Sequence, residues 1–145
     1  MKPQHCWPEG KVRMTVARQV VVGVALASLF VLHSSSAQQV GTSRTELQRH
    51  NLSAHGREVI QVRVDLDPGT RAPSHRHPGE EVIYVLGGTW EYRLDDKEPV
   101  TLGAGDVLFI PAGTVHSARN IGATKGSELA TYIVEMGRPL VEVME

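Results

Sequence analysis

From residue 59 onward the chain is a series of short segments in which hydrophobic and polar residues alternate. Ile60 to Leu66 alternate in this way, which predicts a strand with one buried face. Comparable segments recur roughly every 8 to 12 residues without helical periodicity, as in all-β sandwiches and barrels. We expect strands at residues 59–66, 81–86, 89–94, 100–102, 106–110, 115–120 and 129–134. The pattern therefore predicts one all-β domain.

Turn-forming residues separate these segments. Asp67-Pro68-Gly69 follows the first strand and predicts a turn. Gly87-Gly88 lies between two alternating segments, which predicts a two-residue β-hairpin. The signal at residues 45–50 is weaker and fits either a short turn or an added edge strand.

The first 37 residues follow a different pattern. A basic start leads into an uncharged apolar run at residues 20–32, and small residues follow at Ser35 and Ala37. These features predict a secretory signal peptide, with residue 38 as the first residue of the mature chain. The run is shorter than the ~20 residues that a membrane-spanning helix needs, so we expect no membrane span after signal removal. The initiating residue is open between Met1 and Met14.

The chain accordingly divides into three parts. Residues 1–37 form the predicted signal peptide, residues 38–58 a polar segment or edge strand, and residues 59–145 the folded domain. A cleaved signal places the mature protein in the periplasm or outside the cell. The sole cysteine, Cys6, would leave with the signal, so the mature chain would have no disulfide, thiolate ligand or cysteine nucleophile.

Charge argues against a nucleic-acid partner. The chain has a formal net charge of -1, from 15 basic and 16 acidic residues. Four of the basic residues and one acidic residue precede residue 38, which leaves 11 basic against 15 acidic residues in the mature chain. The remaining basic residues form no stripe, so we expect a small-molecule ligand or substrate and no nucleic acid.

Candidate chemistry is concentrated in two groups of residues with fixed spacing, G-x5-H-x-H-x3-E-x6-G and G-x5-P-x-G-x2-H-x3-N. The first comprises Gly69, His75, His77, Glu81 and Gly88, and the second Gly105, Pro111, Gly113, His116 and Asn120. Together they offer three imidazoles and one carboxylate, a set suited to a divalent transition metal.

With every position matched, the two groups resemble the two-motif signature of the cupin superfamily, in particular small single-domain cupins of the type-2 kind that bacteria export. The resemblance implies a single-domain jelly roll, or double-stranded β-helix barrel, for residues 59–145. It also implies a metal held by four side chains: His75, His77, Glu81 and His116. Register with the family selects Glu81 over Glu80, which would face away along the strand.

Strand geometry adds detail to this site. Residues two apart in a strand share a face, so we expect His75 and His77 to point the same way. The same alternation predicts that Ile83 and Val85 line the cavity beside Glu81, which would make the pocket apolar.

For several other residues the sequence leaves more than one role open. Trp90, Tyr92 and Tyr132 fit the core, a dimer interface or substrate contacts, and Arg119 and Asn120 fit either support of the site or polar strand ends. His50 and His55 have no partner in the pattern and are interpreted as ordinary histidines.

The ligand set leaves the metal's identity open among Fe, Mn, Ni, Co, Cu and Zn. Three histidines and one glutamate leave one or two coordination positions free, as in reactive sites. We therefore expect a small-molecule metalloenzyme of the dioxygenase, isomerase, decarboxylase or lyase type. No further acid or base stands out near the ligands, so catalysis is assigned to the metal centre itself. The alternative is a periplasmic cupin that binds or senses a metal or small ligand without turnover.

Oligomeric state follows from strand edges. A small jelly roll leaves exposed edges, and the resemblance implies that a homodimer covers them, often through exchange of an N-terminal segment. Residues 44–66 are the candidates for that exchange.

Overall fold

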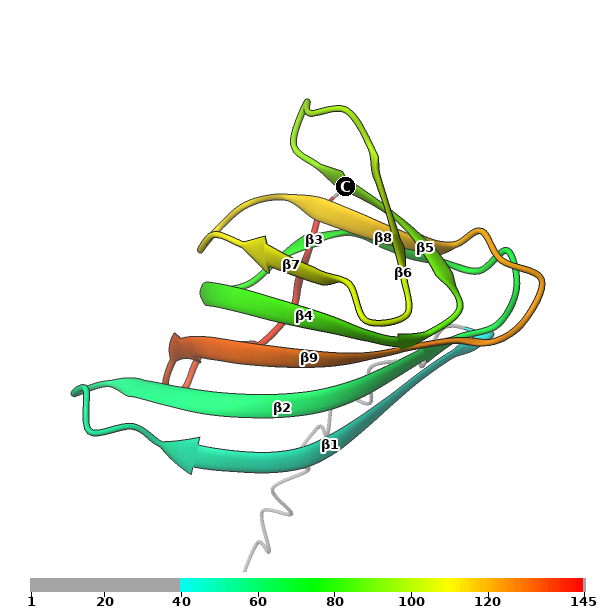
Figure 1. Cartoon of the computed structure of the whole chain (residues 1–145). Helices are drawn as coiled ribbons and strands as arrows, with labels where there is room; N and C mark the ends of the chain where they lie inside the picture. The colour runs from blue at the N-terminus through cyan, green and yellow to red at the C-terminus, as the bar shows by residue number, and fades with distance from the viewer. Residues whose placement is uncertain (1–39, 145) are drawn as a thin grey trace, which may run out of the picture. The chain divides into compact units, whose positions relative to one another are not determined.

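The structure, a computed structural model, describes residues 40–144, which form ten strands in two antiparallel sheets (Figure 1). The strands are β1 (Thr42–Asn51), β2 (Arg57–Leu66), β3 (Arg71–Arg76), β4 (Gly79–Gly87), β5 (Thr89–Leu94), β6 (Val100–Gly103), β7 (Val107–Ile110), β8 (His116–Asn120), β9 (Gly126–Glu135) and β10 (Glu142–Val143). These residues contain no helix, and hence none long and apolar enough to cross a membrane. The all-β prediction is confirmed.

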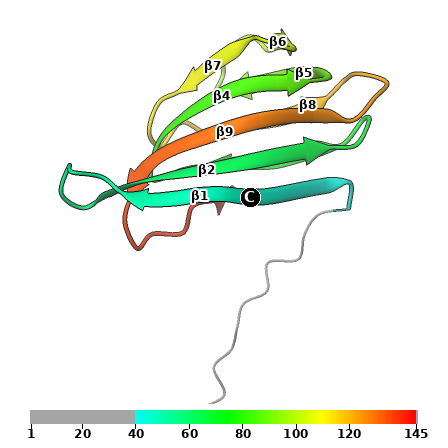
Figure 2. The ribbon, with the colours of Figure 1, turned by 60° about the horizontal axis from the view of Figure 1, so that its bottom comes forward.

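The two sheets each contain five strands. The first has the order β1-β2-β9-β4-β7 and the second β10-β3-β8-β5-β6. Figure 2 shows β1, β2, β9 and β4 side by side in the first sheet. Pairs such as β2 with β9, in register from Arg57↔Glu135 to Leu66↔Gly126, join segments far apart in the sequence. The sheets enclose one core.

Alternation places the core residues. Along β2, Ile60, Val62, Val64 and Leu66 are buried, so the phase predicted for this strand is confirmed. Burying such a side chain stabilises the fold by about 1.5–3 kcal/mol relative to leaving it exposed. The largest fully buried side chains are Trp90, Tyr92 and Tyr132, which excludes them from a dimer interface.

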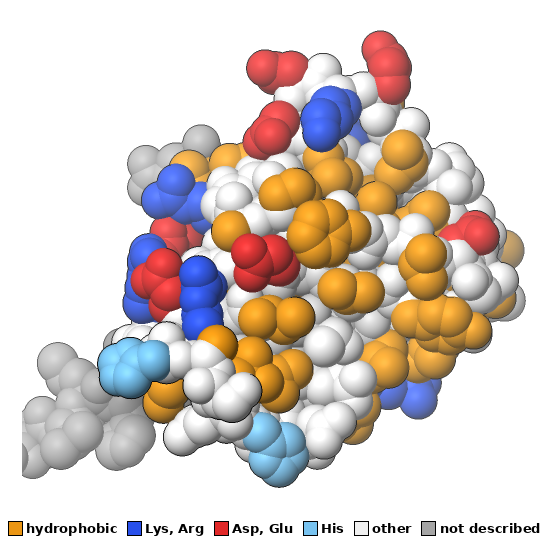
Figure 3. Space-filling model, turned by 60° about the vertical axis from the view of Figure 1, so that its left-hand side comes forward, with side chains coloured by type: hydrophobic (Ala, Val, Ile, Leu, Met, Phe, Trp, Pro, Cys, Tyr) orange, Lys and Arg blue, Asp and Glu red, His pale blue; other side chains and the backbone are white. Residues whose placement is uncertain are grey.

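The outer side of β4 and β7 is apolar as well. Large exposed hydrophobic side chains alternate there with buried ones, and Val82 lies opposite Phe109 and Tyr84 opposite Val107. Hydrophobic side chains cover much of the view in Figure 3. We call this surface the apolar face, made of Val82, Tyr84, Leu86, Val107 and Phe109.

The predicted hairpin at Gly87-Gly88 is wrong. β4 pairs with β7 and β9, whereas β5 pairs with β6 and β8, so the chain crosses from one sheet to the other at Gly88. Gly88 has φ 84, and a Cβ added there would lie 2.6 Å from the Cα of Gly126. The glycine is needed for this close crossing rather than for a tight hairpin.

The remaining differences lie at the ends of the domain and at β3, which was not among the expected strands. Residues 45–50 belong to a full edge strand, β1, that pairs with β2 of the same chain, and the short strand β10 was not predicted. The turn after β2 is confirmed by the Thr70 N–H donating to the Asp67 carbonyl at 3.0 Å. The predicted signal peptide at residues 1–37 and Cys6 lie outside the described residues.

Candidate metal centre

The four predicted ligands meet between the two sheets. His75 in β3 and His116 at the start of β8 are directly paired across the second sheet, and Glu81 lies on β4 of the first sheet. His77 comes one residue after the end of β3, in the connection to β4. All four side chains are buried.

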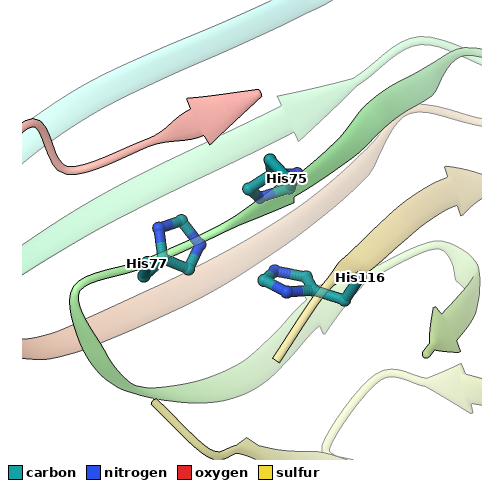
Figure 4. Close-up of side chains that lie close together, drawn as sticks. All are labelled: His75, His77 and His116. Atoms are coloured by element: carbon teal, nitrogen blue, oxygen red, sulfur yellow. The ribbon is translucent and has the colours of Figure 1, made fainter. Parts of the chain in front are cut away.

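The side chains of His75 and His77 point the same way, as strand parity predicts. β3 ends at Arg76, but the alternation continues one residue further, because His75 and His77 are buried and Arg76 between them is exposed. The two rings point into the same space, with centroids 4.9 Å apart (Figure 4). The expectation is confirmed.

The distances suit a shared cation. The candidate ligand atoms of the three histidines all lie within 4.8 Å of one another. Oε2 of Glu81 lies 3.3 Å from Nε2 of His77 and 3.1 Å from Nε2 of His116. A small ion could therefore contact all four side chains with little movement.

Backbone carbonyls orient the three rings. Nδ1 of His75 lies 2.7 Å from the Pro73 carbonyl, Nδ1 of His77 2.6 Å from that of Leu140, and Nδ1 of His116 3.0 Å from that of Thr114. A carbonyl oxygen only accepts hydrogen bonds, so each Nδ1 carries the proton. In the neutral rings each Nε2 then presents a lone pair, which is the arrangement that metal-binding histidines adopt.

The lone pairs in this cluster lack protein donors. Nε2 of His77 and Oε2 of Glu81 are buried and have no hydrogen-bond partner among residues 40–144. Buried polar atoms without partners are costly. Acceptors that face one another are satisfied by a cation, so the donor set fits a divalent metal.

The protonation states of His75 and Glu81 also favour metal binding. Burial, followed by the neighbouring charge of His116, lowers the pKa of His75 to about 4, so this imidazole is neutral near pH 7. Burial by itself would raise the pKa of Glu81, but the contacts with His116 and His77 outweigh it and hold that pKa well below its usual range. Metal binding requires neutral imidazoles and an ionised carboxylate.

Several neighbouring residues have other roles. Glu80 is only partly buried, whereas Glu81 is 3% exposed and faces the histidines, in agreement with the choice of Glu81. Asn120 is buried and bonds backbone groups, donating to the carbonyls of Leu66 at 2.9 Å and Thr124 at 2.7 Å, so its role is structural. Arg119 is exposed.

The prediction that Ile83 and Val85 line the cavity is wrong. Both are buried in the core but do not line the small cavity beside the histidines. Its walls combine apolar side chains with four polar ones: Tyr92 and Tyr132, for which substrate contact was one of the open roles, and Arg44 and Glu128, which sequence reasoning did not assign to the site. The ring of Tyr132 also lies 4.7 Å from that of His77, centroid to centroid.

Glu128 is the missed residue with the clearest signal in the sequence. It lies in the buried phase of β9, with Gly126, Ala130 and Tyr132, where hydrophobic residues are expected. A carboxylate in the apolar phase of a strand marks a site. No comparable signal identified Arg44, because it lies on the weakly predicted strand β1.

Comparison with known proteins agrees with this geometry. Residues 62–133 match the family described as cupin domain. The chain belongs to the cupin superfamily. The double-stranded β-helix protein of Klebsiella pneumoniae has the same fold, with a TM-score of 0.61, 23% identity and coverage of 74% of this chain and 88% of that one. The predicted jelly roll is confirmed.

Curated relatives include proteins with stated ligands. An oxalate-binding protein of Thermotoga maritima is 36% identical over 81 residues, which are 55% of this chain and 66% of the relative. Dimethylsulfoniopropionate lyase of Ruegeria pomeroyi is 38% identical over 56 residues, 39% of this chain and 28% of the lyase. Gentisate 1,2-dioxygenase of Ralstonia is 31% identical over 98 residues, 63% of this chain and 26% of that enzyme. The chain thus spans just under two thirds of the first relative and less than a third of the other two.

Proposed function

We propose that this cupin binds one divalent transition metal through His75, His77, Glu81 and His116 and acts as a small-molecule metalloenzyme. The observation that carries the proposal is the set of buried lone pairs without protein donors beside a small cavity. When bound, such a metal supplies Lewis-acid or oxygen-binding chemistry at its free coordination positions.

The protein's own groups would serve a reaction in this cavity. The two sheets exclude water from the centre, which strengthens electrostatic interactions inside. Glu128 adds the acid–base group that the sequence did not reveal. Burial raises its pKa to about 8, although the hydrogen bond from Tyr92 acts in the opposite direction. A carboxyl group with a pKa near the working pH can both donate and accept a proton.

The relatives suggest the substrate class. Oxalate, dimethylsulfoniopropionate and gentisate, the compounds in their names, are all carboxylates. The cavity next to the histidines is small, with a volume of about 20 Å³. We infer a short organic acid, or the acid end of a longer molecule, as the substrate.

The metal proposal is tested by comparing H116Q and E81Q with H55Q, since His55 is exposed and remote from the site motif. We expect about one metal per wild-type chain and an affinity more than about 100-fold lower in H116Q, because loss of a supporting partner alone costs 10–100-fold. Elemental analysis and metal titration measure both quantities. Equal metal content in H116Q and H55Q would contradict the proposed site.

Enzymatic activity needs its own measurement. Oxygen uptake and substrate loss should be screened over short organic acids with metal-loaded and metal-depleted protein. Turnover that needs both the metal and Glu81 supports the enzyme. Binding of an acid without turnover favours the second candidate, a non-catalytic binding cupin. The relative from Thermotoga maritima, which is named for binding oxalate, is the reason to keep this candidate.

We also propose that the protein is exported and acts in the periplasm or outside the cell, on the signal-peptide pattern of residues 1–37. The intact mass of the protein recovered from the periplasm should correspond to a chain that begins at residue 38. Recovery of the uncleaved chain from the cytoplasm would contradict export.

A further inference from the structure

The cavity beside the histidines has a polar wall that faces them from the first sheet. His75 and His116 belong to the second sheet, whereas Arg44 and Glu128 lie on β1 and β9 of the first. Both line the same cavity as His75, Glu81 and His116. A ligand in this cavity would therefore lie between the candidate metal ligands and these two side chains.

Arg44 supplies a fixed positive charge at the edge of this cavity. Its Nη2 donates to the Tyr132 hydroxyl at 2.8 Å, and its guanidinium carbon lies 6.0 Å from the centre of the Tyr132 ring. The residue as a whole is exposed on the edge strand β1. A guanidinium has five N–H donors in one plane, which match the oxygens of a carboxylate.

Glu128 lies in the same cavity wall as Arg44, with its carboxyl group buried. The Tyr92 hydroxyl donates to its Oε2, which is the only hydrogen bond to the Glu128 side chain found among residues 40–144. The charged or titratable groups that act on Glu128 from the surrounding strands are Tyr92 of β5, Glu81 of β4 and Arg44 of β1. Burial raises the pKa of Glu128 to about 8 in the metal-free protein, and a cation bound at Glu81 would act in the opposite direction.

The charges add to a positive site. A divalent metal would contribute +2, Arg44 +1, ionised Glu81 -1 and Glu128 at most -1, so the sum is at least +1. Low-dielectric surroundings amplify this excess, which favours a ligand of negative charge.

We propose that Arg44 is the residue that selects the ligand's carboxylate group in this cavity. The proposal rests on the proposed metal-dependent function and deepens it. Arg44 lies outside residues 62–133, the part that matches the cupin domain, so this selectivity belongs to the edge strand of this chain rather than to the matched core.

A purely structural role for Arg44 makes a different prediction. If Arg44 only offsets the charges of Glu81 and Glu128, its loss lowers stability or metal affinity, and ligand charge makes no difference. If Arg44 binds the ligand, its loss weakens carboxylates selectively. Pairs of charged and neutral ligands of the same shape separate the two roles.

The experiment compares wild type, R44Q and R49Q, each loaded with Zn²⁺ and checked for metal content. Arg49 is the matched control because it lies on the same strand but bonds Glu46 and Glu58 instead of lining the cavity. The probes are glycolate, oxalate, neutral glycolamide and inorganic sulfate, titrated by calorimetry at pH 7. Thermal unfolding without ligand shows whether each variant is folded.

We expect wild type and R49Q to bind glycolate or oxalate about 10- to 100-fold more tightly than R44Q does, the range for one charged hydrogen bond. Glycolamide should bind weakly and equally to all three proteins. Equal carboxylate affinity in R44Q and R49Q would overturn the proposal, as would loss of metal from R44Q alone. Sulfate binding as tight as that of oxalate would overturn the selectivity for carboxylates.

The experiment distinguishes failure of the proposed Arg44 role from failure of the proposed metal-dependent function. Zn²⁺-loaded wild type that binds none of the acids overturns the role of Arg44 and leaves the metal site standing. Wild type that retains no Zn²⁺ removes the proposed function itself, and the role of Arg44 with it.

Discussion

Glu128 carries a carboxyl group into the interior, where it is 4% exposed and hydrogen-bonded by Tyr92. Buried acids of this kind reduce stability when they ionise, so they persist in proteins where they serve a site. Glu128 lines the cavity beside the candidate metal ligands, and this is the site that it would serve. The neighbouring ligand Glu81 is the contrast, because its contacts with His77 and His116 keep it ionised.

The free energy of unfolding of the metal-free protein should depend on pH through the titration of Glu128. Its pKa is about 8 in the folded chain and near 4.5 in the unfolded one, so the folded state holds the proton more tightly between these values. The free energy of unfolding therefore falls as pH rises through this window, by at most about 1.4 kcal/mol for each pH unit.

The variant E128Q lacks this titration and should gain stability relative to wild type from pH 5 to pH 8. Urea unfolding at several pH values, with chelator present, measures the difference. Histidine titration occurs in both proteins and cancels. A difference that stays constant with pH would mean that Glu128 is ionised in the folded chain.

At the scale of elements, alternation within a segment was enough to place most strands. β5 begins and ends where the pattern predicted, and β2 has the predicted buried phase. Pairing was not predictable from such local patterns, because two alternating segments beside a Gly-Gly pair look the same whether they pair or separate. The outcome is decided by β9 and β7, which pair with the two edges of β4 and leave no place there for β5.

The crossing at Gly88 can be tested against Gly56. Both have positive φ, 84 and 74, but only at Gly88 would a Cβ meet the backbone, 2.6 Å from Gly126 Cα, whereas nothing lies within 4 Å at Gly56. G56A should lower the free energy of unfolding by about 1–2 kcal/mol through the φ effect alone. G88A should cost clearly more, since the sheets must also shift. Equal losses in urea unfolding would show that the close approach is unimportant.

At the scale of the whole molecule, the apolar face is the feature that the monomer leaves unexplained. Phe109 is 57% exposed and Val107 65%, both on the edge strand β7. Contiguous exposed hydrophobic side chains and an unpaired strand edge are both typical of interaction sites. We expect the homodimer predicted from the sequence to cover this face, which adds β4 and β7 to residues 44–66 as candidate contacts.

Light scattering should give the mass of a dimer for the purified mature protein. The substitution F109D places a charge in the apolar face and should shift the protein toward monomer. I121D is the control, since Ile121 is also an exposed hydrophobic residue but lies outside that face. A monomeric wild type would contradict the dimer, and dissociation of both variants would place the interface elsewhere.

The sequence alone determined the all-β class and most of the strands, because these depend on local alternation, and the four candidate ligands came from residue spacing together with the resemblance to the cupins. Tertiary structure decided which strands pair and that the Leu140 carbonyl orients the ring of His77. It also brought Arg44 and Glu128, 84 positions apart, into one cavity wall. Such convergence depends on the closure of two sheets around a core, which no local pattern encodes.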